Sequence, residues 1–289
     1  MISILLALFS AVFGAVANLL ARKLARQQIP TRDLFAINFL LMMLFLAPAA
    51  PVFWNFTFSQ FAMLLLLAAI SLDGLANFCY FRSFEQLDAT TASSVLAVSP
   101  IFALLLAPLF GNLTGRIECH QIFAIILLAA GILAVVNGFS PFREGVRRGR
   151  AKEFAFPLAA AFLFSASMYP LKILFDTDAI NAYTYYLIRA AMIGLVAGMV
   201  LKARFSWLNK GFAFQIAGRL LFVIGQWLAL LTALQLDHPA VVKAVADLSP
   251  LFVLGFSWGI LREKPGKTQI FGVVMIVLGA VLLTLFETL

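Results

Sequence analysis

Ten apolar stretches, separated by short polar breaks, divide this chain of 289 residues. They cover residues 2–21, 33–50, 59–81, 89–110, 119–139, 154–174, 180–201, 212–236, 240–261 and 269–286. About twenty apolar residues span the hydrocarbon core of a bilayer when they form a helix, which satisfies its backbone hydrogen bonds internally. The pattern therefore predicts an all-α membrane protein with ten transmembrane helices.

The composition supports a membrane protein and gives no sign of an enzyme. Hydrophobic residues make up 63% of the chain and charged residues 12%, whereas soluble domains carry roughly 25% charged residues. The sequence contains no metal-ligand cluster, no paired histidines at helical spacing and no glycine-rich phosphate loop. We therefore expect no catalytic activity and no bound cofactor.

The second half of the sequence repeats the plan of the first at a steady offset of about 150 residues, which indicates a duplication. Matched positions are Asn38 and Arg189, Asn77 and Gln226, Asp88 and Asp237, and Ser99-Pro100 and Ser249-Pro250. Each copy holds five helices, and an odd number turns the second copy upside down in the membrane. We predict two inverted five-helix repeats, 1–140 and 154–289, joined by a basic linker at 141–153.

The positive charges predict how the chain is oriented. Of the 21 Lys and Arg residues, 15 fall in the first, fifth, seventh and ninth connections between the apolar stretches. By the positive-inside rule these connections are cytoplasmic and both termini lie outside. The net charge of +8 thus reflects topology, and we expect no nucleic-acid partner. The predicted setting is a bacterial inner membrane, with lipid around a monomer or homodimer.

The two halves share a pattern with a known group of transporters. Each has a small-residue run into Ser-Pro, then a polar turn and a glycine-spaced last helix, fullest in the second copy with Arg262-Glu263-Lys264, Gly272 and Gly279. This plan resembles the drug/metabolite transporter superfamily, EamA type, although the first copy has Gly115 or Arg116 where a glutamate is expected. The resemblance implies a transporter of small metabolites with peripheral fifth and tenth helices. Inverted repeats also place a substrate site near the midplane and work by alternating access.

Polar side chains inside the apolar stretches are the candidate substrate contacts, because ionisable groups in hydrocarbon are costly. Asp73, Asn77 and Tyr80 form one stripe at helical spacing in the third stretch. Lys243 and Asp247 are four residues apart in the ninth stretch and have no charged counterparts in the first half. They contact substrate or neutralise each other, and the two interpretations are compatible.

Further candidates lie at a similar depth in other stretches: Tyr169, Tyr185, Arg189 and Gln226 for substrate binding, and Pro100 and Pro250 for kinks or gating. Arg189 is expected to face the cavity or to pair with a carboxylate. The prolines donate no backbone hydrogen bond and would free a carbonyl one turn earlier. Asn18 is expected to make a contact between helices rather than to bind substrate.

A cavity that presents cations and carboxylates together suits a zwitterion, with its carboxylate on Lys or Arg and its ammonium on Asp. We predict a secondary active exporter of amino acids or related small metabolites, with Asp73 or Asp247 as the proton-coupling site. An exchanger of organic anions or phosphate compounds and a lipid-carrier flippase are the alternatives within transport. A membrane scaffold or membrane enzyme is the alternative from another class.

Overall fold

The computed structural model describes most of both halves of the chain. The described residues are 2–25, 29–87, 92, 95–96, 98–113, 123–124, 126–127, 130–131, 134, 154–205, 208, 210–237, 239–249, 251–253, 255–256 and 266–285. The predicted linker at 141–153 lies outside them, and so does Pro250.

This part of the chain is helical, and its β-structure is limited to one isolated bridge between Phe56 and Ile180. The first half contains α1 (Ile2–Ala25), α2 (Thr31–Leu46), η1 (Ala47–Ala49), α3 (Ala50–Phe53), α4 (Gln60–Gln86), α6 (Ser99–Leu106) and η2 (Ala107–Leu113). The second half contains α9 (Ala155–Asp176), α10 (Ala182–Val200), α11 (Lys210–Leu236), α12 (Pro239–Ala246) and α14 (Lys267–Leu285). Six helices among the described residues are long and apolar enough to cross a membrane. The helical membrane fold is thus confirmed, and the number of ten spans stays a prediction.

Two of the predicted spans differ from expectation, because each is interrupted. The stretch expected as one helix over 89–110 has a turn at Val98, and α6 begins at Ser99. Pro100 therefore lies in the first turn of a helix, where its missing N–H would have no helical partner, and not at a kink inside a helix. The stretch expected over 240–261 is interrupted after Ala246, where α12 ends.

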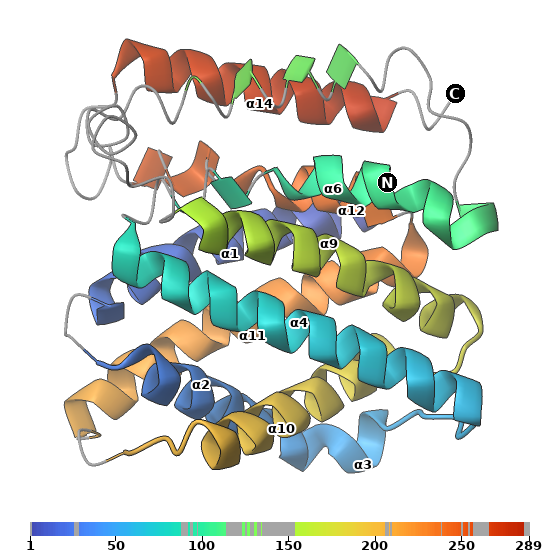
Figure 1. Ribbon diagram of the computed structural model, residues 1–289, viewed down its shortest axis with the longest axis vertical. Helices are drawn as coiled ribbons and strands as arrows, with labels where there is room; N and C mark the ends of the chain where they lie inside the picture. The colour runs from blue at the N-terminus through green and yellow to red at the C-terminus, as the bar shows by residue number, and fades with distance from the viewer. Residues whose placement is uncertain are drawn as a thin grey trace.

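The contacts between the halves follow a two-fold pattern (Figure 1). Helix α1 packs along α11 and α4 packs along α9, so the first and third helices of the halves exchange roles. Helix α2 packs along α10, and α6 packs along α12, which pairs each helix with its own repeat counterpart. A two-fold relation between the repeats produces this self-complementary interface.

Helix α14, the last described helix of the second half, lies at one end of the molecule. Figure 1 shows α14 beyond the layer formed by α6 and α12. A Cβ added to Gly131, in the fifth apolar stretch, would lie 2.7 Å from the carbonyl oxygen of Gly272 in α14. Gly131 therefore lies directly against the backbone of α14, a distance that only glycine permits at this position.

Candidate functional site

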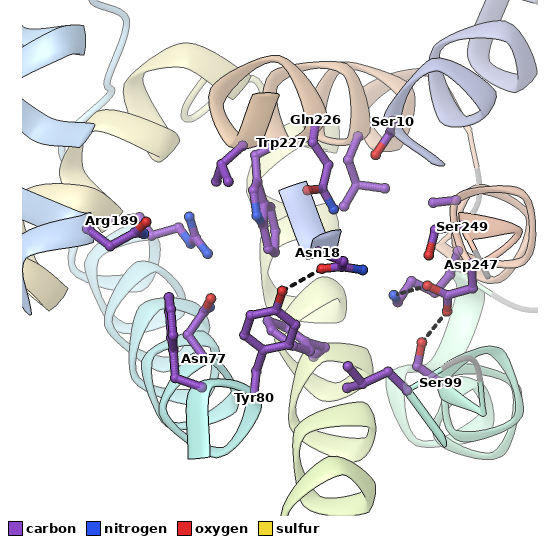
Figure 2. Close-up of a pocket in the computed structure, with 18 of the residues that line it drawn as sticks. Ser10, Asn18, Asn77, Tyr80, Ser99, Arg189, Gln226, Trp227, Asp247 and Ser249 are labelled. Carbon is purple, nitrogen blue, oxygen red and sulfur yellow. Dashed lines mark hydrogen bonds and ion pairs between the residues drawn. The ribbon is translucent and has the colours of Figure 1, made fainter. Parts of the chain in front are cut away.

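A cavity of about 100 Å³ lies between the two halves (Figure 2). Helices α1, α2, α4 and α6 line it from the first half, and α9, α10, α11 and α12 line it from the second. Six of the predicted substrate contacts line this cavity: Asn77, Tyr80, Arg189, Gln226, Lys243 and Asp247. A water molecule needs about 10–15 Å³ measured in this way, so the cavity holds several waters or one small solute.

Asp73 stands behind the cavity wall and forms a buried ion pair. Arg189 Nε donates to Asp73 Oδ2, and the two side chains are 0% and 2% exposed. Asn77 Nδ2 donates to the same carboxylate oxygen at 3.1 Å and to the Asp73 carbonyl at 2.9 Å. The polar stripe predicted on α4 thus exists, but Asp73 meets the arginine of α10 and does not line the cavity.

The guanidinium of Arg189 is held between aromatic rings at the cavity wall. Its central carbon lies 4.0 Å from the ring centroid of Trp227, 5.2 Å from that of Phe39 and 5.3 Å from that of Tyr186. Arginine stacks well on such faces because its planar charge is weakly hydrated. Its Nη1 and Nη2 atoms are buried and have no hydrogen-bond partner among the described residues.

A second charged cluster lies on the opposite side of the cavity (Figure 2). Lys243 Nζ lies 2.7 Å from Asp247 Oδ1, and Ser99 Oγ donates to the other oxygen of this carboxylate. Ser165 Oγ in turn donates to the Ser99 carbonyl at 2.6 Å. The cluster therefore joins the start of α6 to the end of α12, and it links one half of the chain to the other.

The two remaining predicted tyrosines lie outside the cavity lining. Tyr169 donates its hydroxyl hydrogen to the Ala103 carbonyl and stacks on Phe110 at a centroid distance of 4.6 Å. Tyr185 is buried and packs edge-on against Phe175 at 6.4 Å. Both hold helices together in this structure.

The comparisons with known proteins bear on what such a cavity does. The sequence profile of the EamA-like transporter family matches residues 1–137 and 153–285, nearly the whole chain and once in each half. The chain belongs to the EamA-like transporter family. This confirms the resemblance to the drug/metabolite transporter superfamily, and it makes the chain a multi-pass membrane protein of a family that transports small molecules.

The fold agrees with a solved structure, whereas no curated protein matches the chain significantly. That structure, titled "Crystal structure of protein", covers 96% of this chain, and the match covers 98% of its own length. The TM-score is 0.66 at 15% sequence identity. The likeness shows that this EamA-like chain shares its fold, and it says nothing of a substrate.

Some cavity residues of this EamA-like transporter carried only a weak signal in the sequence. Asn18, expected as a contact between helices, accepts a hydrogen bond from the Tyr80 hydroxyl at 2.5 Å and also lines the cavity. Arg219, 4% exposed, donates from Nη1 to Asn38 and also lines the cavity. The signal available for Asn18 and Arg219 was that each is a polar residue inside an apolar stretch. Trp227 gave none, because aromatic residues are common throughout this chain.

Proposed function

We propose that this chain is a secondary active exporter of small zwitterionic metabolites, with amino acids as the substrate class, and that it works by alternating access. One observation carries the proposal. A single cavity between the two halves has the guanidinium of Arg189 on one side and the carboxylate of Asp247 on the other (Figure 2). A solute with both a carboxylate and an ammonium group complements these two sides.

The charged lining of the cavity supports selection for such a solute. Burying a charged group is costly unless it meets an opposite charge or hydrogen-bond partners. A zwitterion brings both charges, its carboxylate for the arginines of the lining and its ammonium group for Asp247, whereas a solute without charges complements neither side. The small volume further favours a single small metabolite over a lipid carrier.

Alternating access has support in the contacts between the halves. The ion pair of Arg189 with Asp73 and the hydrogen bond of Ser99 with Asp247 both join the first half to the second. A rocking motion of one half against the other would change these contacts together. Asp247 is the better proton-coupling site of the two acids, because it lines the cavity and is partly exposed.

An exchanger of small organic anions is the second candidate, and the charge of Arg219 favours it. Asp73 and Asp247 each neutralise one cation, Arg189 and Lys243 respectively. Arg219 bonds to the neutral oxygens of Asn38 and Ala17 and forms no ion pair within the described part of the chain. The cavity lining therefore has one net positive charge there, which a net anionic substrate would neutralise.

Transport into proteoliposomes tests the two functions. Purified protein would be reconstituted with an imposed pH gradient, and uptake of labelled amino acids would be compared with uptake of the matching carboxylic acids. Saturable amino-acid movement that depends on the gradient and is lost in Asp247→Asn supports the first proposal. Movement of carboxylic acids alone, abolished in Arg219→Gln, would replace it by the anion exchanger.

The chain supplies a matched control for the first variant. Lys172 and Asp176 form an ion pair at 2.8 Å between residues four apart, as Lys243 and Asp247 do. This pair lies near the end of α9 and outside the cavity lining. Asp176→Asn removes the carboxylate of an ion pair with the same spacing but outside the cavity, so transport should persist in it. Equal loss in Asp176→Asn and Asp247→Asn would show that the loss reflects folding and not the site.

A further inference from the structure

We infer that Arg189 is the carboxylate-binding subsite of the cavity and that Asp73 is a positioning residue for it, not a substrate contact. The inference rests on the proposed function and deepens it, because it assigns one end of the substrate to one side chain. The sequence left this choice open between Lys243 and Arg189.

Arg189 has hydrogen-bond donors that its described neighbours leave unused. A guanidinium has five N–H donors, of which the one on Nε is taken by Asp73. The other four are on Nη1 and Nη2, which are buried without a partner among the described residues. Buried donors of this kind are rare in folded proteins and call for a partner that arrives with water or a ligand.

The contacts of Arg189 fix the direction in which these donors point. Asp73 fixes the Nε edge of the guanidinium, and Trp227 covers one face at 4.0 Å. The remaining edge carries Nη1 and Nη2, and Figure 2 shows it turned toward the middle of the cavity. Two parallel N–H donors on one edge match the two oxygens of a carboxylate.

Lys243, on the opposite side of the cavity, is a poor site for the substrate carboxylate. Lys243 Nζ already has Asp247 Oδ1 at 2.7 Å. A substrate carboxylate there would lie beside the carboxylate of Asp247 and would be repelled. The same Asp247 attracts an ammonium group, so the two ends of a zwitterion are sorted by the carboxylate that lines the cavity beside Lys243 and by its absence from the lining beside Arg189.

The charge balance favours a carboxylate over a phosphate group. Asp73 neutralises Arg189, so this subsite offers donors but little net charge. A monoanion with two planar oxygens is satisfied by one such edge, whereas a phosphate dianion is bound better by several cations. Asp73 thereby sets both the geometry of Arg189 and the anion that it prefers.

The test separates the two ends of the substrate by chemistry. Binding to the purified full-length protein is measured by calorimetry for an amino acid, for the same molecule without its amino group and for the same molecule without its carboxylate. Alanine with propionate and ethylamine, leucine with 4-methylpentanoate and isoamylamine, and phenylalanine with 3-phenylpropionate and phenethylamine supply three sizes. Inorganic phosphate is added as a competing anion.

We expect Arg189→Gln to weaken binding of the amino acid and of the carboxylic acid by about 10- to 100-fold, because each ligand loses a charge-assisted hydrogen bond. Binding of the amine should be unchanged. Asp73→Asn should weaken the same two ligands and spare the amine, which a merely structural role would not do. Since Arg189→Gln leaves Asp73 buried and unpaired, the double variant Arg189→Gln with Asp73→Asn tests the same loss without a buried charge. Arg82→Gln is the matched control, because Arg82 pairs with Glu85 outside the cavity.

The outcomes separate the subsite from the function. Carboxylate binding that is equal in wild type and in the double variant overturns the subsite, even if amino acids are transported. Failure of every carboxylate to bind the wild type, or binding of phosphate alone, also overturns it. Carboxylates that bind through Arg189 while no amino acid crosses proteoliposomes would uphold the subsite and refute the proposed function.

Discussion

Gly131 offers a stringent test of the packing between the last helices of the two repeats. In Gly131→Ala the new Cβ would lie 2.7 Å from the carbonyl oxygen of Gly272 and 2.8 Å from the backbone nitrogen of Ile276. Ordinary contacts of carbon atoms begin at about 3.5 Å. Both neighbours are backbone atoms that no rotamer change can move, so the two helices would have to separate.

The expected cost follows from two opposed effects. Overpacking a well-packed contact costs about 1–3 kcal/mol. Replacing glycine by alanine inside a helix returns about 1 kcal/mol. Gly218→Ala isolates the second effect, because a Cβ at Gly218 in α11 would meet no atom within 4 Å. We therefore expect Gly131→Ala to be about 1–3 kcal/mol less stable than Gly218→Ala.

Thermal inactivation of the purified protein in one detergent measures this difference. Half-lives at a fixed temperature are the proper quantity, because membrane proteins of this size often unfold irreversibly. Gly131→Ala should inactivate faster than wild type, while Gly218→Ala should be equal or slower. Transport per folded molecule should be unchanged in Gly131→Ala, since this contact is remote from the cavity lining. Equal half-lives for the two alanine variants would refute the close approach of these helices.

Three further predictions concern residues that the sequence marked as candidate substrate contacts. Tyr169→Phe should lower stability by about 1 kcal/mol through its lost hydrogen bond and leave transport per folded protein intact; reduced transport would show that this tyrosine acts in the cavity. Tyr80→Phe, which loses the contact with Asn18, should slow proteoliposome transport with little change in melting temperature, and an unaltered rate would contradict a role at the site. The double variant Asp247→Asn with Lys243→Met should give more folded protein on gel filtration than Asp247→Asn alone, because the single variant leaves the buried ammonium of Lys243 without its carboxylate. Equal yields would mean that the pair is not needed for folding.

In the candidate site, helical spacing predicted which residues share a face of a helix but not which residues of other helices contact them. The stripe of Asp73, Asn77 and Tyr80 was visible in the sequence, and these residues do share a face of α4 that meets the cavity wall. Spacing alone could not show that Asp73 would be covered by Arg189, since α10 approaches that end of the stripe from more than one hundred residues away. Pro100 likewise marked a change of backbone, but whether it kinks a helix or begins one depended on the turn at Val98.

The sequence by itself determined that the chain is a helical membrane protein built from a repeated unit. The bilayer imposes length and apolarity on each spanning helix separately, so these features can be read without knowing its neighbours. Only the tertiary structure decided which charged groups pair and which face the cavity. Asp73 and Asp247 were equally available to Arg189 in the sequence, and the packing of α10 against α4 brought it to Asp73. The choice of partner depends on distances between helices that the order of residues does not contain.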